Sequence, residues 1–140
     1  MKRFCTLCLL FLTACAPSDH DEFGNYNNVE LTHNEMQAIT QDIATFLRLS
    51  DGANTVINLE HDDSEFAHTL IEALRREGIG VSQGNPMDYL NLRYRVEKFN
   101  ERQFFVSATL SDGRTLSRIW VLNNNALIPL KTRAYGVNNE

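Results

Sequence analysis

The densest group of side chains that could do chemistry lies at residues 61–68. His61, Asp62, Asp63 and His68 place imidazoles and carboxylates close together, and such groups act as metal ligands or as general acids and bases. The two aspartates, however, stand where a helix is expected to begin and suit helix capping. The position one turn after His68 is Glu72 rather than a second histidine. We therefore expect no metal, no cofactor and no catalytic residue.

Cys15 offers a different chemistry, the attachment of lipid to its thiol. Lys2 and Arg3 precede an apolar run over residues 4–12, which is the layout of a secretory signal and is too short to span a bilayer as a helix. Leu12-Thr13-Ala14-Cys15 then resembles the bacterial lipobox, in which cleavage leaves the cysteine as a diacylated N-terminus. The sequence predicts a signal peptide over residues 1–14 and a lipid anchor at Cys15. The alternative is an ordinary signal peptide with incidental cysteines.

Composition limits the partners of the mature chain. The formal net charge is −5, and it falls to −7 once Lys2 and Arg3 leave with the signal peptide. An acidic surface is a poor match for nucleic acid, so we expect no such partner. All three cysteines lie at or before residue 15, so the folded part has no disulfide and depends on an ordinary hydrophobic core. Ala16, rather than an aspartate, follows Cys15, and by resemblance to Gram-negative lipoproteins this predicts the periplasmic face of the outer membrane.

Three further segments are expected after the anchor. Residues 15–30 are polar, acidic and rich in turn formers, which predicts a lipidated N-terminus followed by a flexible tether. The spaced aromatic residues Phe23 and Tyr26 also allow this segment to become ordered against a partner. A globular domain is expected over residues 31–132, and a polar C-terminal tail over residues 133–140.

Periodicity predicts the elements that carry these side chains. Thr32 and Glu35 form a capping-box pattern before a helix over residues 33–49, and a second amphipathic helix follows the polar residues 61–65 and ends before Gly78. Alternation of apolar and polar residues predicts strands in the second half. Strands are expected at residues 55–59, 79–83, 90–99, 104–110, 114–122 and 126–130. The order α-β-α-β followed by an antiparallel meander gives a small two-layer α+β sandwich with helices on one face of the sheet.

Four arginines on this meander are candidates for a partner interface: Arg93, Arg95, Arg114 and Arg118. Alternation places Arg93 and Arg95 on one face of their strand. Outward-facing arginines on an antiparallel sheet usually form a solvated face. The alternative is that they dock onto a partner that carries carboxylates, which the arginine fork suits. Tyr94 and Trp120 are expected in the core, with an interface role as the alternative.

Several segments, taken in order, resemble the TrbH family of conjugal-transfer lipoproteins over about residues 12–130. They are LTAC, FAHTLIEALRREGIGV, LNLRYRVEKF and the hairpin LSDGRTLSRIWVLNNNALIPL. The resemblance implies an outer-membrane lipoprotein that is a structural part of a conjugative type IV secretion system and acts in mating-pair formation. Other secretion subunits would be its partners, and it could form a homo-oligomer or ring. The resemblance implies no catalytic residue, and by analogy the element order is similar to small domains of secretins.

A competing interpretation is a lipid-anchored periplasmic inhibitor or small-ligand-binding lipoprotein. It requires a pocket or a protruding loop. The candidate loops are residues 83–88 and residues 123–125.

Overall fold

The computed structural model describes residues 19–84 and 87–137 of the 140-residue chain. The predicted signal peptide and Cys15 lie outside the described residues. The elements are β1 (Tyr26–Asn27), α1 (His33–Asp51), β2 (Val56–Asn58), α2 (Glu65–Arg76), β3 (Gly80–Ser82), β4 (Leu90–Asn100), β5 (Gln103–Leu110), β6 (Arg114–Asn123) and β7 (Ala126–Val137).

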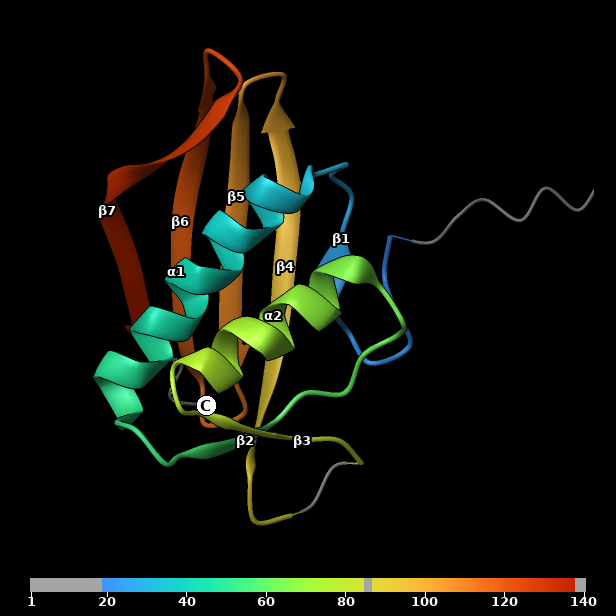
Figure 1. Cartoon of the computed structure of the whole chain (residues 1–140), viewed down its shortest axis with the longest axis vertical. Coiled ribbons are helices and arrows are strands. Elements are labelled where there is room, and N and C mark those ends of the chain that lie inside the picture. The colour runs from blue at the N-terminus through green and yellow to red at the C-terminus, as the bar shows by residue number, and fades with distance from the viewer. Residues whose placement is uncertain (1–18, 85–86, 138–140) are drawn as a thin grey trace, which may run out of the picture.

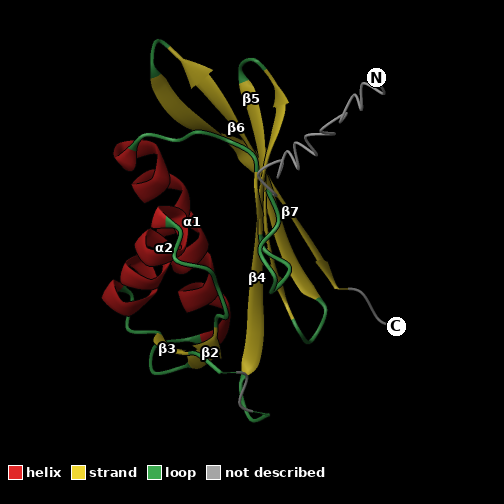
Figure 2. Cartoon of the chain, turned by 90° about the vertical axis from the view of Figure 1, so that its right-hand side faces the viewer, coloured by secondary structure: helices red, strands yellow, loops and turns green. Residues whose placement is uncertain are grey.

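The seven strands form one sheet, in the order β3-β2-β4-β5-β6-β7, with β1 paired to β4 beside this path (Figure 1). β4 to β7 form an antiparallel meander, whereas the short strands β1 and β2 run parallel to β4. Both helices lie on one side of the sheet, and the other face of the meander carries no helix (Figure 2). The fold is therefore a mixed α and β domain dominated by strands. Strand β1, ahead of α1, was not in the predicted order.

Local capping explains where the two helices begin. The Thr32 hydroxyl accepts a hydrogen bond from the Glu35 N–H (3.3 Å), and the Glu35 carboxylate accepts one from the Thr32 N–H (2.8 Å). This is the reciprocal capping box that the sequence predicted. Helix α2 is capped by Ser64, whose hydroxyl accepts from the Ala67 N–H at 3.2 Å. The expectation that Asp62 and Asp63 cap this helix was wrong, because the cap is Ser64. Asp62 instead accepts a hydrogen bond from the Ser64 N–H.

The core lies between the helices and the sheet. Alternate residues of β4 and β5 face the helices and are buried, as the period of two predicted. Tyr94 and Trp120 are also buried, with 4% and 3% of their surface exposed, so both are core residues. The buried helix residues that meet this face include Ile39, Ile43, Phe66, Leu70 and Leu74.

The N-terminal segment departs from the predicted flexible tether. Tyr26 and Asn27 pair with Arg95 and Val96 of β4. Asn25 is almost completely buried, with 1% of its surface exposed. We call residues 19–28 the N-terminal clamp, because this segment is fixed to the domain rather than free.

The Asn25 amide explains this order. Its Nδ2 donates to the Asp21 carboxylate (2.7 Å) and to the Glu60 carbonyl (2.8 Å), and its Oδ1 accepts from the Tyr94 N–H (3.1 Å). A buried amide that is satisfied in this way stabilises the fold, whereas an unsatisfied one would destabilise it. The polar residues that suggested a flexible tether include Asp21 and Asn25, which form these hydrogen bonds within the domain.

The predicted C-terminal tail is also different over its first part. Strand β7 continues to Val137, so residues 133–137 belong to the sheet. The register shifts at a bulge between Arg118 and Trp120, because Arg118 pairs with Arg133 whereas Trp120 pairs with Pro129. The bulge and the edge position interrupt the simple alternation of apolar residues. The sequence pattern therefore predicted a strand that ends at residue 130, whereas β7 ends at Val137.

Candidate functional site

The structure divides the four candidate arginines between the two faces of the sheet. Leu92, Tyr94 and Val96 of β4 face the helices, so Arg93 and Arg95 point to the face that carries no helix. On β6 the arrangement is reversed. Arg114 and Arg118 are on the side of α1 and form ion pairs with its residues.

Arg118 belongs to a group that we call the Asp42 network, which consists of Asp42, Arg118 and Arg133. The Asp42 Oδ1 accepts from Nη1 of Arg118 at 2.7 Å and from Nη2 of Arg133 at 2.6 Å. The side chains of Asp42 and Arg118 are each 12% exposed, and that of Arg133 is 32% exposed. The network joins α1 to β6 and β7. Sequence analysis missed Asp42 and Arg133, because no local pattern relates residues so far apart in the chain.

Arg114 ties the end of α1 to the hairpin between β5 and β6. Its guanidinium donates to Asp51 (2.7 Å) and to Asp112 (2.8 Å). Burial acts to lower the pKa of Arg114, but the two hydrogen bonds and the negative charges of both aspartates together outweigh it and hold that pKa above its ordinary value. Because Arg114 and Arg118 are engaged within the chain, we restrict the proposed arginine interface to Arg93 and Arg95.

The two outward arginines have different surroundings. Arg95 pairs with Glu97 at 2.9 Å and lies over the Tyr26 ring, 4.6 Å from its centroid. Arg93 is exposed and forms no ion pair with the residues that the structure describes. Its side chain passes close to Gly24, where an added Cβ would lie 3.5 Å from the Arg93 Cδ and where φ is +90°. Arg93 is therefore the outward arginine whose charge remains available to a partner.

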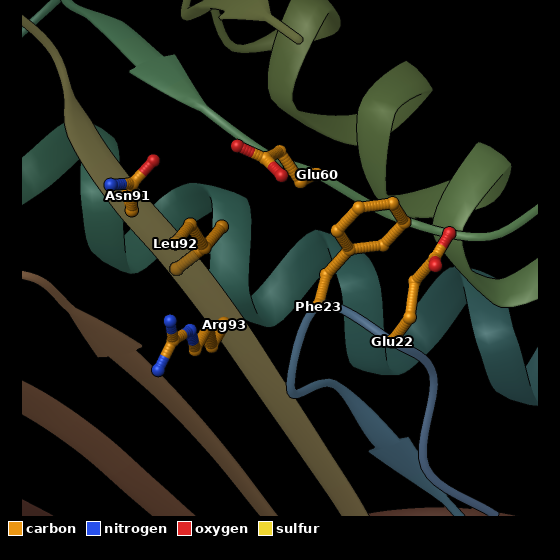
Figure 3. A pocket seen from close by; sticks show the side chains of 6 residues that line it. All are labelled: Glu22, Phe23, Glu60, Asn91, Leu92 and Arg93. Carbon is orange, nitrogen blue, oxygen red and sulfur yellow. The ribbon is translucent and has the colours of Figure 1, made fainter. Parts of the chain in front are cut away.

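A shallow pocket of about 200 Å³ lies beside β4, where β2 ends and the N-terminal clamp enters. Figure 3 shows Glu22, Glu60 and Phe23 on one side of β4, whereas Arg93 projects away from them. The remaining lining residues are Asn91 and Leu92. The pocket thus has an acidic and aromatic wall, and Arg93 does not face the glutamates across it.

The cluster at residues 61–68 forms contacts within the domain. The His61 and His68 rings meet edge to face with centroids 5.4 Å apart, and His68 pairs with exposed Asp63 at 3.2 Å. Nδ1 of His61 contacts the Asp62 carbonyl, and its Nε2 lies 2.9 Å from the Gln83 amide. Among residues 19–84 and 87–137, no three His, Cys, Asp or Glu side chains come together in a metal-binding group.

The loop candidates of the ligand-binding interpretation differ in what the structure describes. Asn124 and Asn125, in the turn before β7, adopt positive φ values of 48° and 62°. Together with Arg102 and Leu122 they line an open hollow of about 450 Å³. Residues 85–86 of the other loop lie outside the described part of the chain.

Tyr94 connects the sheet, α2 and the N-terminal clamp. Its hydroxyl lies 3.3 Å from the Ser64 hydroxyl at the start of α2, and its ring packs against Phe66. Burial raises the pKa of Tyr94 to about 12, opposed by the hydrogen bond with Ser64 and assisted by Asp21 and Asp62. The phenol is thus held neutral well above its usual range.

This shift predicts how stability depends on alkaline pH. Because the pKa of Tyr94 is raised in the folded state, its contribution is complete below about pH 10 and is lost as the pH rises through about 12. A shift of this size corresponds to about 2–3 kcal/mol. Chemical unfolding at a series of pH values should show this loss, and ultraviolet titration should show one late phenolate. Tyr94→Phe should remove the late phenolate and reduce the alkaline loss; an unchanged profile would contradict the assignment.

The described residues thus form a small two-layer domain of helices and strands. Most of its ion pairs connect different parts of the domain to one another. None of the helices formed by residues 19–84 and 87–137 is both long enough and apolar enough to cross a bilayer.

Comparisons with curated proteins and with solved structures gave no match. The model of one family, described as conjugal transfer protein TrbH, matches residues 18–137. The chain therefore belongs to the TrbH family of conjugal transfer proteins, as its sequence segments predicted.

Proposed function

We propose that the protein is a lipid-anchored structural component of a conjugative type IV secretion system. Acyl chains on Cys15 would hold it at the periplasmic face of the outer membrane, and its domain would bind other secretion subunits during mating-pair formation. The observation that carries this proposal is the match of residues 18–137 to the conjugal transfer family. The protein would act by binding, without catalysis, cofactor or nucleic acid, and a ring of several copies is one form that its assembly could take.

Two surfaces are suited to such binding. The first is the free edge of β7, a strand of 12 residues at one end of the sheet order. An edge strand presents unpaired backbone N–H and C=O groups, which a strand of a neighbouring subunit can pair with. The second is the sheet face without helices, which includes Arg93. Ile128 and Leu130 of β7 are 46% and 44% exposed.

A lipid anchor would act through concentration. Confining the domain to a membrane surface raises its effective concentration for subunits in the same membrane, without adding any contact to the interface. Two or three acyl chains hold a small domain on a bilayer effectively permanently.

The anchor provides the main test of this function. Cys15→Ser should release the protein to the periplasm and reduce conjugation to background, while the domain stays folded. Cys8→Ser is a matched control, because it makes the same change within the predicted signal peptide and should leave conjugation unchanged. Membrane fractionation, mating frequency and far-ultraviolet circular dichroism are the measurements. Normal mating and membrane association with Cys15→Ser would refute the proposal.

An affinity isolation from detergent-solubilised envelopes separates this function from the ligand-binding alternative, which the hollow at Asn124 and Asn125 favours. A tag after Glu140 should co-isolate secretion-channel subunits in a large assembly. Isolation of the protein alone, or with one small soluble target, would favour the inhibitor or ligand-binding interpretation.

A further inference from the structure

The Asp42 network has more positive than negative charge. One carboxylate faces two guanidinium groups, because both Arg118 and Arg133 donate to the same Oδ1 of Asp42. Among the described residues, the buried Nε atoms of Arg118 and Arg133 find no acceptor. Buried donors without acceptors are rare in native proteins and call for an explanation. The domain thus carries an incompletely neutralised cationic group at this place.

Arg133 brings this group to the free edge of the sheet. It lies on β7, pairs with Arg118 of β6 on one side, and has no strand on its other side within the described chain. Its side chain keeps about a third of its surface exposed (32%) despite the contact with Asp42. Tyr135, two residues further on the same face, packs on Phe46 of α1 and is 54% exposed.

We propose that the free edge of β7 accepts an extended segment of a different protein, which places a carboxylate against Arg133. The backbone of this segment would pair with β7, and its acidic side chain would give the Asp42 network a second carboxylate. A guanidinium group can bind two carboxylates at once, because it has five N–H donors in a planar fork. This inference rests on the proposed function, since it names the partner chemistry of the subunit-binding edge.

A second copy of this chain does not supply such a segment through its sheet edges. Strand β7 itself carries Lys131 and Arg133 and no acidic residue. Pairing of two β7 strands would therefore bring four cations together, which is unfavourable. The opposite edge, β3, is Gly-Val-Ser and has no charged side chain. The charge pattern thus favours a partner of different sequence.

Site-specific photo-crosslinking tests the inference in cells that contain the complete transfer system. The full-length protein carries a photoreactive amino acid in place of Tyr135. In the control protein the photoreactive amino acid replaces Phe99, which is 70% exposed near the end of β4 and is distant in sequence from β7. Mass spectrometry of the Tyr135 adduct should identify one segment of another transfer protein, with Asp or Glu within a few residues of the crosslink. An adduct to a second copy, an adduct to a segment without a carboxylate, or no adduct would overturn the inference.

Matched charge variants identify the role of Arg133. Arg133→Gln should lower the yield of the Tyr135 adduct at least about tenfold, because it removes one half of a charged pair. Lys131→Gln removes a charge from the same strand and should change the yield less than about twofold. Thermal unfolding would show whether each variant is folded. We expect Arg133→Gln to be folded because Asp42 still forms its ion pair with Arg118. Arg133→Glu should also lose the adduct, and an Arg in place of the partner's carboxylate should restore it.

The two proposals can fail separately. If Arg133→Gln and Arg133→Glu keep the adduct and mate normally while Cys15→Ser does not mate, the inference about β7 is wrong and the proposed function stands. If Cys15→Ser mates normally, the proposed function itself is wrong.

Discussion

Replacing Asp42 with alanine should lower the free energy of unfolding by about 3–5 kcal/mol. The change leaves Arg118 and Arg133 without their shared carboxylate, and the Arg118 side chain is largely covered, with 12% of its surface exposed. Removing one partner of a buried ion pair has this large effect because it leaves uncompensated charge in a poorly solvated place. Trp120 is the single tryptophan of the chain and is buried, so its fluorescence during urea unfolding would report the change.

A matched variant and a rescue make this prediction specific. Asp63→Ala makes the same change at an aspartate whose side chain is 98% exposed, and it should alter stability by less than about 0.5 kcal/mol. Replacing all three members of the Asp42 network with apolar residues of similar size should recover most of the loss. If Asp42→Ala is no more destabilising than Asp63→Ala, the network does not stabilise the fold.

Asn25→Asp should destabilise the domain by about 3 kcal/mol and release the N-terminal clamp. The substitution keeps the size of the side chain but replaces both donors to Asp21 and to the Glu60 carbonyl with a carboxylate oxygen. One carboxylate oxygen then faces two acceptors, Asp21 and the Glu60 carbonyl, in a buried site, which costs more than the loss of the hydrogen bonds alone. Hydrogen exchange of the Asn27 amide, which donates to the Asp19 carbonyl at 3.0 Å, would report the release.

Asn28→Asp is the control for this substitution. The Asn28 Oδ1 accepts from the Lys98 N–H at 2.8 Å, and an aspartate oxygen keeps that role. Its effect on stability should be small. Equal destabilisation by the two substitutions would mean that the buried amide of Asn25 is not what fixes the clamp.

The helices and the meander could be predicted because their signals are local and repeated. Apolar residues at helical spacing predicted a helix over residues 33–49, and α1 spans His33–Asp51. Strand β6 was expected at residues 114–122 and spans Arg114–Asn123. Strand β1 has two residues, too few for any period to appear. Its place in the sheet depends on the hydrogen bonds of Asn25, which a polar composition does not reveal.

The candidate interface was predictable only in part. Alternation shows which residues share a face of a strand, and it correctly grouped Arg93 with Arg95. It does not show whether a helix covers that face. Arg118 meets Asp42 across 76 positions of sequence, so its engagement within the domain depends on how α1 packs on the sheet, which no local pattern determines.

If Cys15 carries lipid, as proposed, the N-terminal clamp also sets the height of the domain above the bilayer. Only four peptide units separate Cys15 from Asp19, whose carbonyl is held by the Asn27 amide, and they reach at most about 14 Å. A flexible segment over residues 15–30 would have reached roughly 50 Å. With lipid on Cys15, as proposed, the edge of the domain at β1 would lie next to the headgroups. Figure 1 shows β7 on the opposite side of the molecule from β1. A partner would therefore reach β7 from the aqueous side of the domain rather than along the membrane surface.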